Sequence, residues 1–201
     1  MKPFCAILLL AAVFTCIPLL AQEKGKSKDE APSMTMPTPL TANEFCKWLV
    51  GEWEGTGTSP FGKTKEWEKV EWGLGNQFVM QHYTSKGIEM SDAQMKAAAE
   101  MMHMSMDDIK KMKDMTYEGM GPLTINPASG EYVGYWFDNW RGMYKGSGKY
   151  EGKKLTMNWE GQMGGEVRTV ERVGDNKMVV TAQEKSPDGK VTESRSELTR
   201  K

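Results

Sequence analysis

Histidine and cysteine are scarce in this chain, which has two histidines and three cysteines among its 201 residues. Cys5 and Cys16 lie in an apolar N-terminal run. Removal of that run would leave Cys46 alone, and a single cysteine forms no internal disulfide. The sequence motifs of zinc sites, calcium loops and phosphate-binding loops are missing, and neither histidine is close to Cys46 along the chain. The sequence therefore predicts no catalytic residue, and it does not support an enzyme.

An excess of charge of one sign is also missing. Lysine and arginine number 26, aspartate and glutamate number 27, and the formal net charge is −1. Such a chain exerts no general attraction on a polyanion. We therefore expect no nucleic-acid partner, while the oligomeric state stays open.

The long apolar run of the chain lies at its N-terminus. Phe4 to Leu20 follow Lys2 and end at Ala21-Gln22, which is the pattern of a secretory signal peptide. We assign residues 1–21 to this signal and expect export to the periplasm or the extracellular space. An uncleaved signal would instead anchor the chain in a membrane. Residues 22–40 are charged and proline-punctuated without aromatic residues, which predicts a disordered tether before a single domain over residues 41–201.

Helical and then strand periodicity follow in this domain. Thr41, as a cap, precedes Phe45, Trp48 and Leu49 at helical spacing, which predicts a short N-terminal helix that ends at Gly51. The period then changes to two, and turn sequences separate the segments. This pattern predicts strands over residues 52–59, 63–74, 77–85, 117–125, 131–139, 142–150, 155–161, 166–173, 177–186 and 190–199. About ten such strands favour an all-β, antiparallel up-and-down barrel, because closure leaves no exposed edge.

A methionine-rich segment over residues 90–115 interrupts this pattern between the third and fourth strands. Ser91 and Ser105 each precede a polar partner by three positions, which predicts a helical hairpin with helices over residues 92–103 and 106–115 at a barrel rim. One interpretation is a pliable apolar lid. The other is a copper site, because thioether sulfur and imidazole suit Cu(I). Its candidate ligands are Met101, Met102, His103, Met104 and Met106.

Several stretches of the domain resemble known families. Gly51-Glu52-Trp53 resembles the Gly-x-Trp start of lipocalin-like calycins, and "GEWEGTG" is similar to the Gly-x-Trp-x-Gly-x-Gly motif of nitrobindin-type barrels. "YEGMGPLTINPASGEYVGYWFDNW", "GSGKYEGKKLTMNWEG" and "LTRK" resemble the bacterial family called domain of unknown function 1579.

This resemblance covers residues 45–201 outside the insertion, and it implies a lipocalin-like barrel. Gly51, Trp53 and Gly55 would be its signature, with Arg200 stacked across Trp53 at the barrel floor. Nitrobindin-type barrels bind haem through a histidine on a late strand. No histidine follows His103 here, so that haem ligand has no counterpart and no cofactor is predicted.

A small set of side chains is expected to face the barrel interior. They are Trp136, Met157, Trp159 and Arg168, together with His82 and Met80, which share a strand face. His82 could be an axial ligand or a hydrogen-bonding group, or an ordinary strand histidine. Such a lining suits a small apolar or amphipathic molecule, although small barrels also fill themselves with aromatic and methionine side chains. The sequence thus predicts non-enzymatic ligand binding in the barrel, with copper binding by the insertion or a protein-interaction scaffold as alternatives.

Overall fold

The computed structural model describes residues 36–162, 164–186 and 189–201. The predicted signal peptide and the predicted tether as far as residue 35 lie outside these residues. The end of the predicted tether contacts the barrel. Leu40 is buried and its amide donates to the Asn76 carbonyl at 2.8 Å, while the Gln77 side chain donates to the Pro37 carbonyl at 3.0 Å. The contacts of the domain therefore begin slightly before residue 41.

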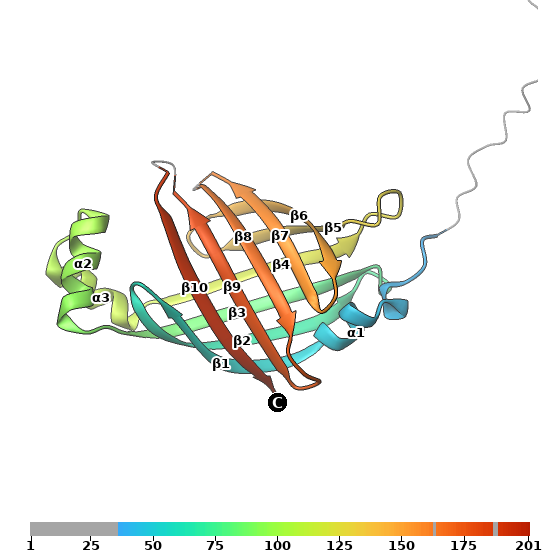
Figure 1. The fold of residues 1–201 in the computed structure, drawn as a ribbon, viewed down its shortest axis with the longest axis horizontal. Coiled ribbons are helices and arrows are strands. Elements are labelled where there is room, and N and C mark those ends of the chain that lie inside the picture. Colours follow the sequence, from blue (N-terminus) through green and yellow to red (C-terminus); the bar gives the residue numbers. More distant parts are fainter. Residues whose placement is uncertain (1–35, 163, 187–188) are drawn as a thin grey trace, which may run out of the picture. The chain divides into compact units, whose positions relative to one another are not determined.

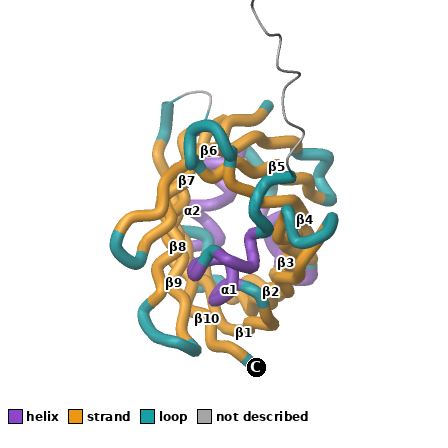
Figure 2. The backbone as a smooth tube through the Cα atoms, turned by 90° about the vertical axis from the view of Figure 1, so that its right-hand side faces the viewer, coloured by secondary structure: helices purple, strands orange, loops and turns teal. Residues whose placement is uncertain are grey.

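Ten antiparallel strands close into a barrel (Figures 1 and 2). They are β1 (Gly51–Ser59), β2 (Gly62–Gly73), β3 (Phe78–Glu89), β4 (Thr116–Ile125), β5 (Tyr132–Asp138), β6 (Met143–Glu151), β7 (Lys154–Gly161), β8 (Gly164–Arg172), β9 (Lys177–Lys185) and β10 (Val191–Arg200). Each strand pairs with its neighbours in sequence, and β10 also pairs with β1, so the sheet closes on itself. The predicted all-β up-and-down barrel is confirmed.

A short helix, α1 (Glu44–Leu49), follows the 3₁₀ turn η1 (Leu40–Ala42) at one end of the barrel (Figure 1). Its Phe45, Trp48 and Leu49 side chains are buried in the barrel core. The predicted cap at Thr41 is wrong, because the chain first makes the 3₁₀ turn. Asn43 caps α1 instead, and its side-chain oxygen accepts a hydrogen bond from the Cys46 amide at 2.9 Å.

The barrel interior is apolar near α1. Successive side chains of a strand point to opposite faces, and the inward-facing residues at this end are large and hydrophobic. Each has at most 2% of its surface exposed: Trp53, Val70, Val79, Leu123, Leu155, Met157, Met178 and Leu198. Together with α1, these residues fill this end of the barrel. A ligand-binding site inside the barrel would therefore lie toward the other end.

The insertion between β3 and β4 is helical, as predicted. It contains α2 (Asp92–Met102), α3 (Met106–Lys111) and the 3₁₀ turn η2 (Met112–Asp114), at the end of the barrel opposite α1 (Figure 1). Ser91 and Ser105 cap the two helices through the expected hydrogen bonds to the amides of the third helical residues. The second helix is shorter than predicted, because η2 replaces its last turn. Within the described ranges, no helix has the length and apolar character needed to cross a membrane.

The insertion has a hydrophobic cluster of its own. Met90, Met95, Ala98 and Ile109 are buried together, and Phe61 from the β1–β2 turn packs against them. This cluster is separate from the core inside the barrel. The hairpin therefore folds onto a barrel rim without contributing to the barrel core.

Candidate functional site

The floor of the barrel is built around Trp53 and Arg200. The Arg200 Cζ atom lies 4.2 Å from the centroid of the Trp53 ring, which is a cation–π arrangement. The same guanidinium donates to the Val50 carbonyl at 2.7 Å and to the Trp48 carbonyl. The Trp53 indole donates to the Leu49 carbonyl at 2.8 Å. These contacts close the end near α1, so a ligand would enter from the opposite end.

Two tryptophans line the wall of the barrel between the floor and the opposite end. The Trp136 ring lies against Gly119 on β4, and the Trp159 ring lies against Gly146 on β6. A Cβ atom on Gly146 would lie 2.6 Å from the Trp159 ring, which leaves no room for a larger residue there. Glycine thus lets each indole pack on the strand backbone as part of the wall.

Solvent reaches the barrel interior in the half that contains Trp136 and Trp159, away from the floor. Arg168 faces inward between Met157 and Ala182, which are 2% and 5% exposed, yet 37% of the Arg168 side-chain surface is exposed. Other inward-facing side chains of this end are also only partly buried. We call this end the open half of the barrel, and its inward-facing residues include Glu66, Glu68, Tyr83, Tyr117, Trp136, Tyr144, Trp159, Glu166, Arg168, Glu184 and Ser196.

Arg168 forms a two-pronged ion pair with Glu166 on the same strand. Its Nε atom lies 2.6 Å from Glu166 Oε1, and its Nη2 atom lies 3.2 Å from Oε2. This geometry satisfies both oxygens of Glu166. Glu66 and Glu68 on β2 and Glu184 on β9 are therefore not part of this ion pair.

Two polar atoms of the open half are buried without a hydrogen-bond partner among the described residues. Glu66 is 5% exposed, and only its Oε1 atom is bonded, to the Thr64 hydroxyl at 3.0 Å. No hydrogen bond of normal geometry reaches its Oε2 atom or the indole Nε1 of Trp159, although the Tyr83 phenol interacts with the Glu66 carboxylate. Buried polar groups are nearly always hydrogen-bonded in native proteins. An acceptor and a donor are thus available for a bound molecule.

Burial disfavours the ionised form of two carboxyl groups in the open half, those of Glu68 and Glu184. Burial raises the pKa of Glu68 to about 7, with a smaller rise from Glu66 and an opposing effect of Arg168. Burial, and then the charge of Glu166, raise the pKa of Glu184. Burial and the Glu66 carboxylate raise the pKa of the Tyr83 phenol, which therefore stays protonated. Four carboxyl groups thus share this half of the barrel with a single guanidinium.

A hydrogen-bonded chain fixes the wall near the β5–β6 turn. The Trp136 indole donates to the Tyr117 hydroxyl at 3.0 Å, and this hydroxyl donates to Asp138 at 3.4 Å. Asp138 also accepts from the amides of Trp140 and Gly142, at 2.9 and 2.7 Å. Burial raises the pKa of Tyr117 to about 12, so the phenol keeps its proton. The Asp138 carboxylate accepts hydrogen bonds from the turn and from Tyr117, so its oxygens already have partners within the protein.

The structure places four of the predicted interior residues on the inner face: Trp136, Met157, Trp159 and Arg168. Met157 belongs to the filled end near the floor, and the other three line the open half.

The expectation that His82 and Met80 point inward is wrong. The His82 side chain is 42% exposed, and its Nε2 lies 3.6 Å from Glu71 Oε1. On β3 the inward positions belong to Val79, Gln81 and Tyr83, and the outward ones to the histidine and methionine. Both faces of β3 mix polar and apolar residues, so alternation alone selected the wrong face.

The methionine and histidine candidates of the insertion lie at the turn between α2 and α3. Met102, His103, Met104 and Met106 are exposed, and the side chain of Met101 is outside the described atoms. His103 ends α2 in a left-handed conformation, with φ of 54°. Over the described ranges, no three histidine, cysteine, aspartate or glutamate side chains are placed to hold a metal ion. Methionine sulfur would thus have to supply most of the ligands of a metal there.

Cys46 lies on α1 and is fully buried, and burial raises the pKa of its thiol to about 12. A thiol of this kind is not a nucleophile near neutral pH.

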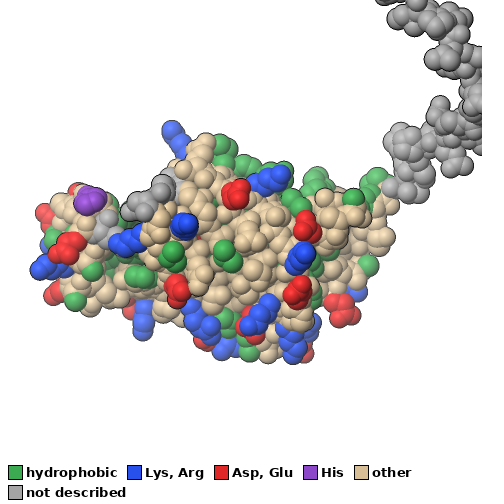
Figure 3. All heavy atoms as spheres, turned by 45° about the horizontal axis from the view of Figure 1, so that its top comes forward, with side chains coloured by type: hydrophobic (Ala, Val, Ile, Leu, Met, Phe, Trp, Pro, Cys, Tyr) green, Lys and Arg blue, Asp and Glu red, His purple; other side chains and the backbone are tan. Residues whose placement is uncertain are grey.

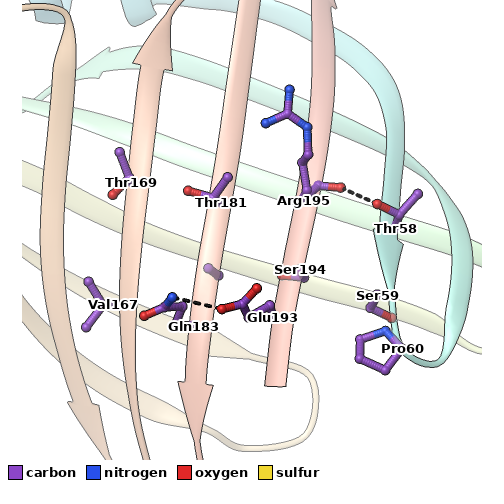
Figure 4. A pocket seen from close by; sticks show the side chains of 11 residues that line it. Thr58, Ser59, Pro60, Val167, Thr169, Thr181, Gln183, Glu193, Ser194 and Arg195 are labelled. Carbon is purple, nitrogen blue, oxygen red and sulfur yellow. Dashed lines mark hydrogen bonds between the residues drawn. The ribbon is translucent and has the colours of Figure 1, made fainter. Parts of the chain in front are cut away.

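The outer surface carries an open depression of about 660 Å³ across β8, β9, β10 and β1 (Figure 4). Its lining is mainly threonine and other polar residues: Thr58, Ser59, Pro60, Val167, Thr169, Thr181, Ala182, Gln183, Glu193, Ser194 and Arg195. Gln183 and Glu193 are hydrogen-bonded to each other at 2.9 Å, and Thr58 bonds to the Arg195 carbonyl at 3.2 Å. These groups satisfy one another, unlike the buried atoms inside the barrel.

The sequence reasoning missed Glu66, Glu68, Tyr83 and Tyr117. A signal was present on β2, where both glutamates lie on the same strand face as Val70 and Trp72. Carboxylates on the apolar face of a strand are candidates for a buried site.

No protein-family model matches this chain, and no curated protein sequence matches it. Solved structures do. Rv2717c from M. tuberculosis is 13% identical over 83% of this chain and 99% of its own, with a TM-score of 0.56. The S-type phycobiliprotein lyase CPES from Guillardia theta is 10% identical over 80% and 92%, with a TM-score of 0.39. A protein of unknown function from the DUF3598 family of Nostoc punctiforme is 8% identical over 83% and 100%, with a TM-score of 0.26.

Of these three structures, we use only Rv2717c for comparison, because its TM-score is above 0.5. At 13% identity this similarity shows a shared fold and nothing about function. The barrel is of the lipocalin-like type. Membership of the family called domain of unknown function 1579 stays a prediction.

Proposed function

We propose that this chain is an exported, non-enzymatic binding protein that holds a small amphipathic molecule in the open half of its barrel. The observation that carries the proposal is the pair of buried polar atoms without a hydrogen bond of normal geometry, Glu66 Oε2 and Trp159 Nε1, in the half of the barrel where the Arg168 side chain is partly exposed. The floor of Trp53 and Arg200 gives the site a closed end, and the indoles of Trp136 and Trp159 give it apolar walls. Apolar walls with a few polar groups are the usual composition of a small-molecule site.

Two serines of the barrel allow a direct test. Ser196 faces inward on β10, and Ser147 faces outward on β6. Ser196→Trp places an indole in the open half, whereas Ser147→Trp adds the same indole to the outer surface. Native mass spectrometry of the chain purified from its own compartment would reveal a retained ligand. Titration with the uncharged fluorophore N-phenylnaphthylamine would measure binding to the emptied protein.

We expect binding by the wild type and by Ser147→Trp, and its loss in Ser196→Trp. Circular dichroism would verify that both variants are folded. If the wild type retains no ligand and does not bind the fluorophore, the proposal fails. It also fails if Ser196→Trp binds as well as Ser147→Trp, because the fluorophore would then sit elsewhere.

A second candidate function is soft-metal binding by the insertion. The observation in its favour is that the hairpin core is made by Met90, Met95 and Ile109, so Met102, His103 and Met104 are exposed and not needed for packing. Thioether and imidazole ligands suit Cu(I). Competition with a coloured Cu(I) chelator would measure the affinity. We expect His103→Ala to weaken it strongly and His82→Ala to leave it unchanged, and equal affinities would refute this function.

A further inference from the structure

The charge inside the open half differs from the charge on the outside of the molecule. Figure 3 shows acidic and basic side chains mixed over the outer face. Inside, Glu66, Glu68, Glu166 and Glu184 face one guanidinium, that of Arg168, among the inward-facing residues defined above. Arg168 is paired directly with both oxygens of Glu166, and its charge lowers the pKa values of Glu68 and Glu184 by less than burial raises them.

Glu66 is held in place so that one oxygen stays available. Its carboxylate lies against Gly57 on β1, where a Cβ atom would collide with Oε1. Thr64 donates to that same Oε1. Oε2 then makes no hydrogen bond of normal geometry in the described part of the chain, on a side chain that is 5% exposed and that interacts with the Tyr83 phenol. Placing a carboxylate this way costs free energy unless a donor or a positive charge is supplied to it.

Aromatic rings share the open half with these carboxylates. Trp159 pairs across the sheet with Glu166, and Tyr83 pairs with Glu68. Trp136 and Tyr117 are hydrogen-bonded to each other on the adjoining wall. The faces of such rings attract cations, and rings combined with carboxylates recognise alkylated ammonium groups in particular.

We infer that the molecule bound in the open half carries a positively charged headgroup, of the amine or quaternary ammonium class, that lies against Glu66 and Glu68 among the aromatic rings. This inference rests on the proposed function and deepens it by naming the chemistry of the ligand. A carboxylate or phosphate headgroup would be repelled by the ionised forms of these glutamates, and a neutral headgroup would not stabilise those forms.

A positive headgroup changes the protonation of its neighbours. Glu66, Tyr83 and Arg168 lie nearest to Glu68 by pairing or electrostatic effect. The other titratable groups on the inner face of this half are Tyr117 from β4, Asp138 from β5, Tyr144 from β6, Glu166 from β8 and Glu184 from β9. Burial raises the pKa values of the three tyrosines, so they do not titrate near neutrality. A bound cation stabilises the ionised form of Glu68, whose pKa in the empty barrel is about 7. Binding near neutral pH should therefore release protons, and affinity should rise as the pH passes through about 7.

The test compares three amphiphiles that share one octyl chain. They are octyltrimethylammonium, neutral octyldimethylphosphine oxide and octanoate, each used below the concentration at which it forms micelles. Isothermal titration calorimetry in two buffers of different ionisation enthalpy measures the affinity and the protons released. The wild type is compared with Glu66→Gln and Glu68→Gln, and with Glu118→Gln, which changes an exposed glutamate on the outside of β4.

We expect the ammonium to bind the wild type about tenfold more tightly than the neutral amphiphile, and octanoate to bind most weakly. Glu66→Gln and Glu68→Gln should each remove most of this preference, so that the ammonium and the neutral amphiphile bind the variant with similar affinity. Glu118→Gln should behave as the wild type. Proton release should accompany ammonium binding and disappear in Glu68→Gln.

The outcomes separate the two proposals. If the neutral amphiphile or octanoate binds as tightly as the ammonium, the inference about the headgroup is overturned, while the binding function stands. If the ammonium preference persists in both glutamine variants, the inference is also overturned, because the cation then lies elsewhere. If none of the three amphiphiles binds the wild type, and N-phenylnaphthylamine does not bind either, the binding function itself falls.

Discussion

Glu68 should make the barrel less stable at alkaline pH than at acidic pH. Its pKa is about 7 in the folded chain, against a usual value of 4.5. Between these two values the folded carboxyl holds a proton that the unfolded one has lost. The folded state then binds more protons than the unfolded state, so the free energy of unfolding falls as the pH rises through this window. Above about pH 7 the loss is complete.

The size of the effect follows from the two pKa values. One pKa unit corresponds to about 1.4 kcal/mol, so the shift from 4.5 to about 7 sets an upper limit of about 3 kcal/mol. Solvent in the open half and coupling to Arg168 reduce the effect, and we expect about 1–3 kcal/mol. Glu68→Gln has no carboxyl group to ionise. It should be close to the wild type in stability at about pH 5 and more stable by this amount at about pH 8.5.

Urea denaturation of the wild type and Glu68→Gln across this pH range measures the difference. Glu118→Gln, on the outer face of β4, is the control and should show no comparable pH dependence. The reasoning is refuted if Glu68→Gln is no more stable than the wild type at alkaline pH. It is refuted as well if the variant gains the same stability at acidic pH, because the gain would then not come from ionisation.

Three further variants test the floor, the wall and the insertion. Arg200→Ala removes the cation–π contact with Trp53 and two hydrogen bonds to carbonyls, so it should lower the free energy of unfolding by about 3 kcal/mol. The thermal midpoint should fall by about 6–12 °C, and a fall below about 2 °C would contradict this account of the floor. Gly146→Val should force the Trp159 ring off the wall, shift tryptophan fluorescence and reduce N-phenylnaphthylamine binding, whereas unchanged binding would show that the wall position is unimportant. Ile109→Ser should abolish amide-exchange protection in α2 and α3 and leave the barrel strands protected, and a parallel loss in the barrel would show that the two cores are coupled.

The barrel could be predicted from the sequence because its signals are local. Alternation fixes the strands, and turns such as Gly174-Asp175-Asn176 fix where they end. Ser91 and Ser105 located the starts of α2 and α3 for the same reason, since a cap lies within one turn of the helix that it begins. Thr41 misled only because Asn43 is an equally good cap two residues later.

The site depends on strand register, which local patterns do not determine. Alternation on β3 offers His82 on one face and Tyr83 on the other, and only pairing with β2 and β4 shows which one is inside. The open half is also assembled from strands far apart in the sequence, since Glu68 on β2 and Arg168 on β8 come within electrostatic range only after closure. Alternation on β2 contained enough to flag Glu66 and Glu68, but an inward carboxylate contradicts the usual expectation of an apolar interior.

Closure of the barrel has a consequence for how the chain folds. β1 and β10 lie at opposite ends of the folded domain's sequence, and Trp53 pairs directly with Arg200, the penultimate residue. Until the last strand is synthesised, β1 and β9 each lack a partner, and the floor cannot form. Pairing between such distant segments is slow, and unpaired strands are prone to aggregate. A nascent or truncated chain that ends before β10 should therefore depend on chaperones, and loss of even the last few residues should be more damaging than most changes at a protein terminus.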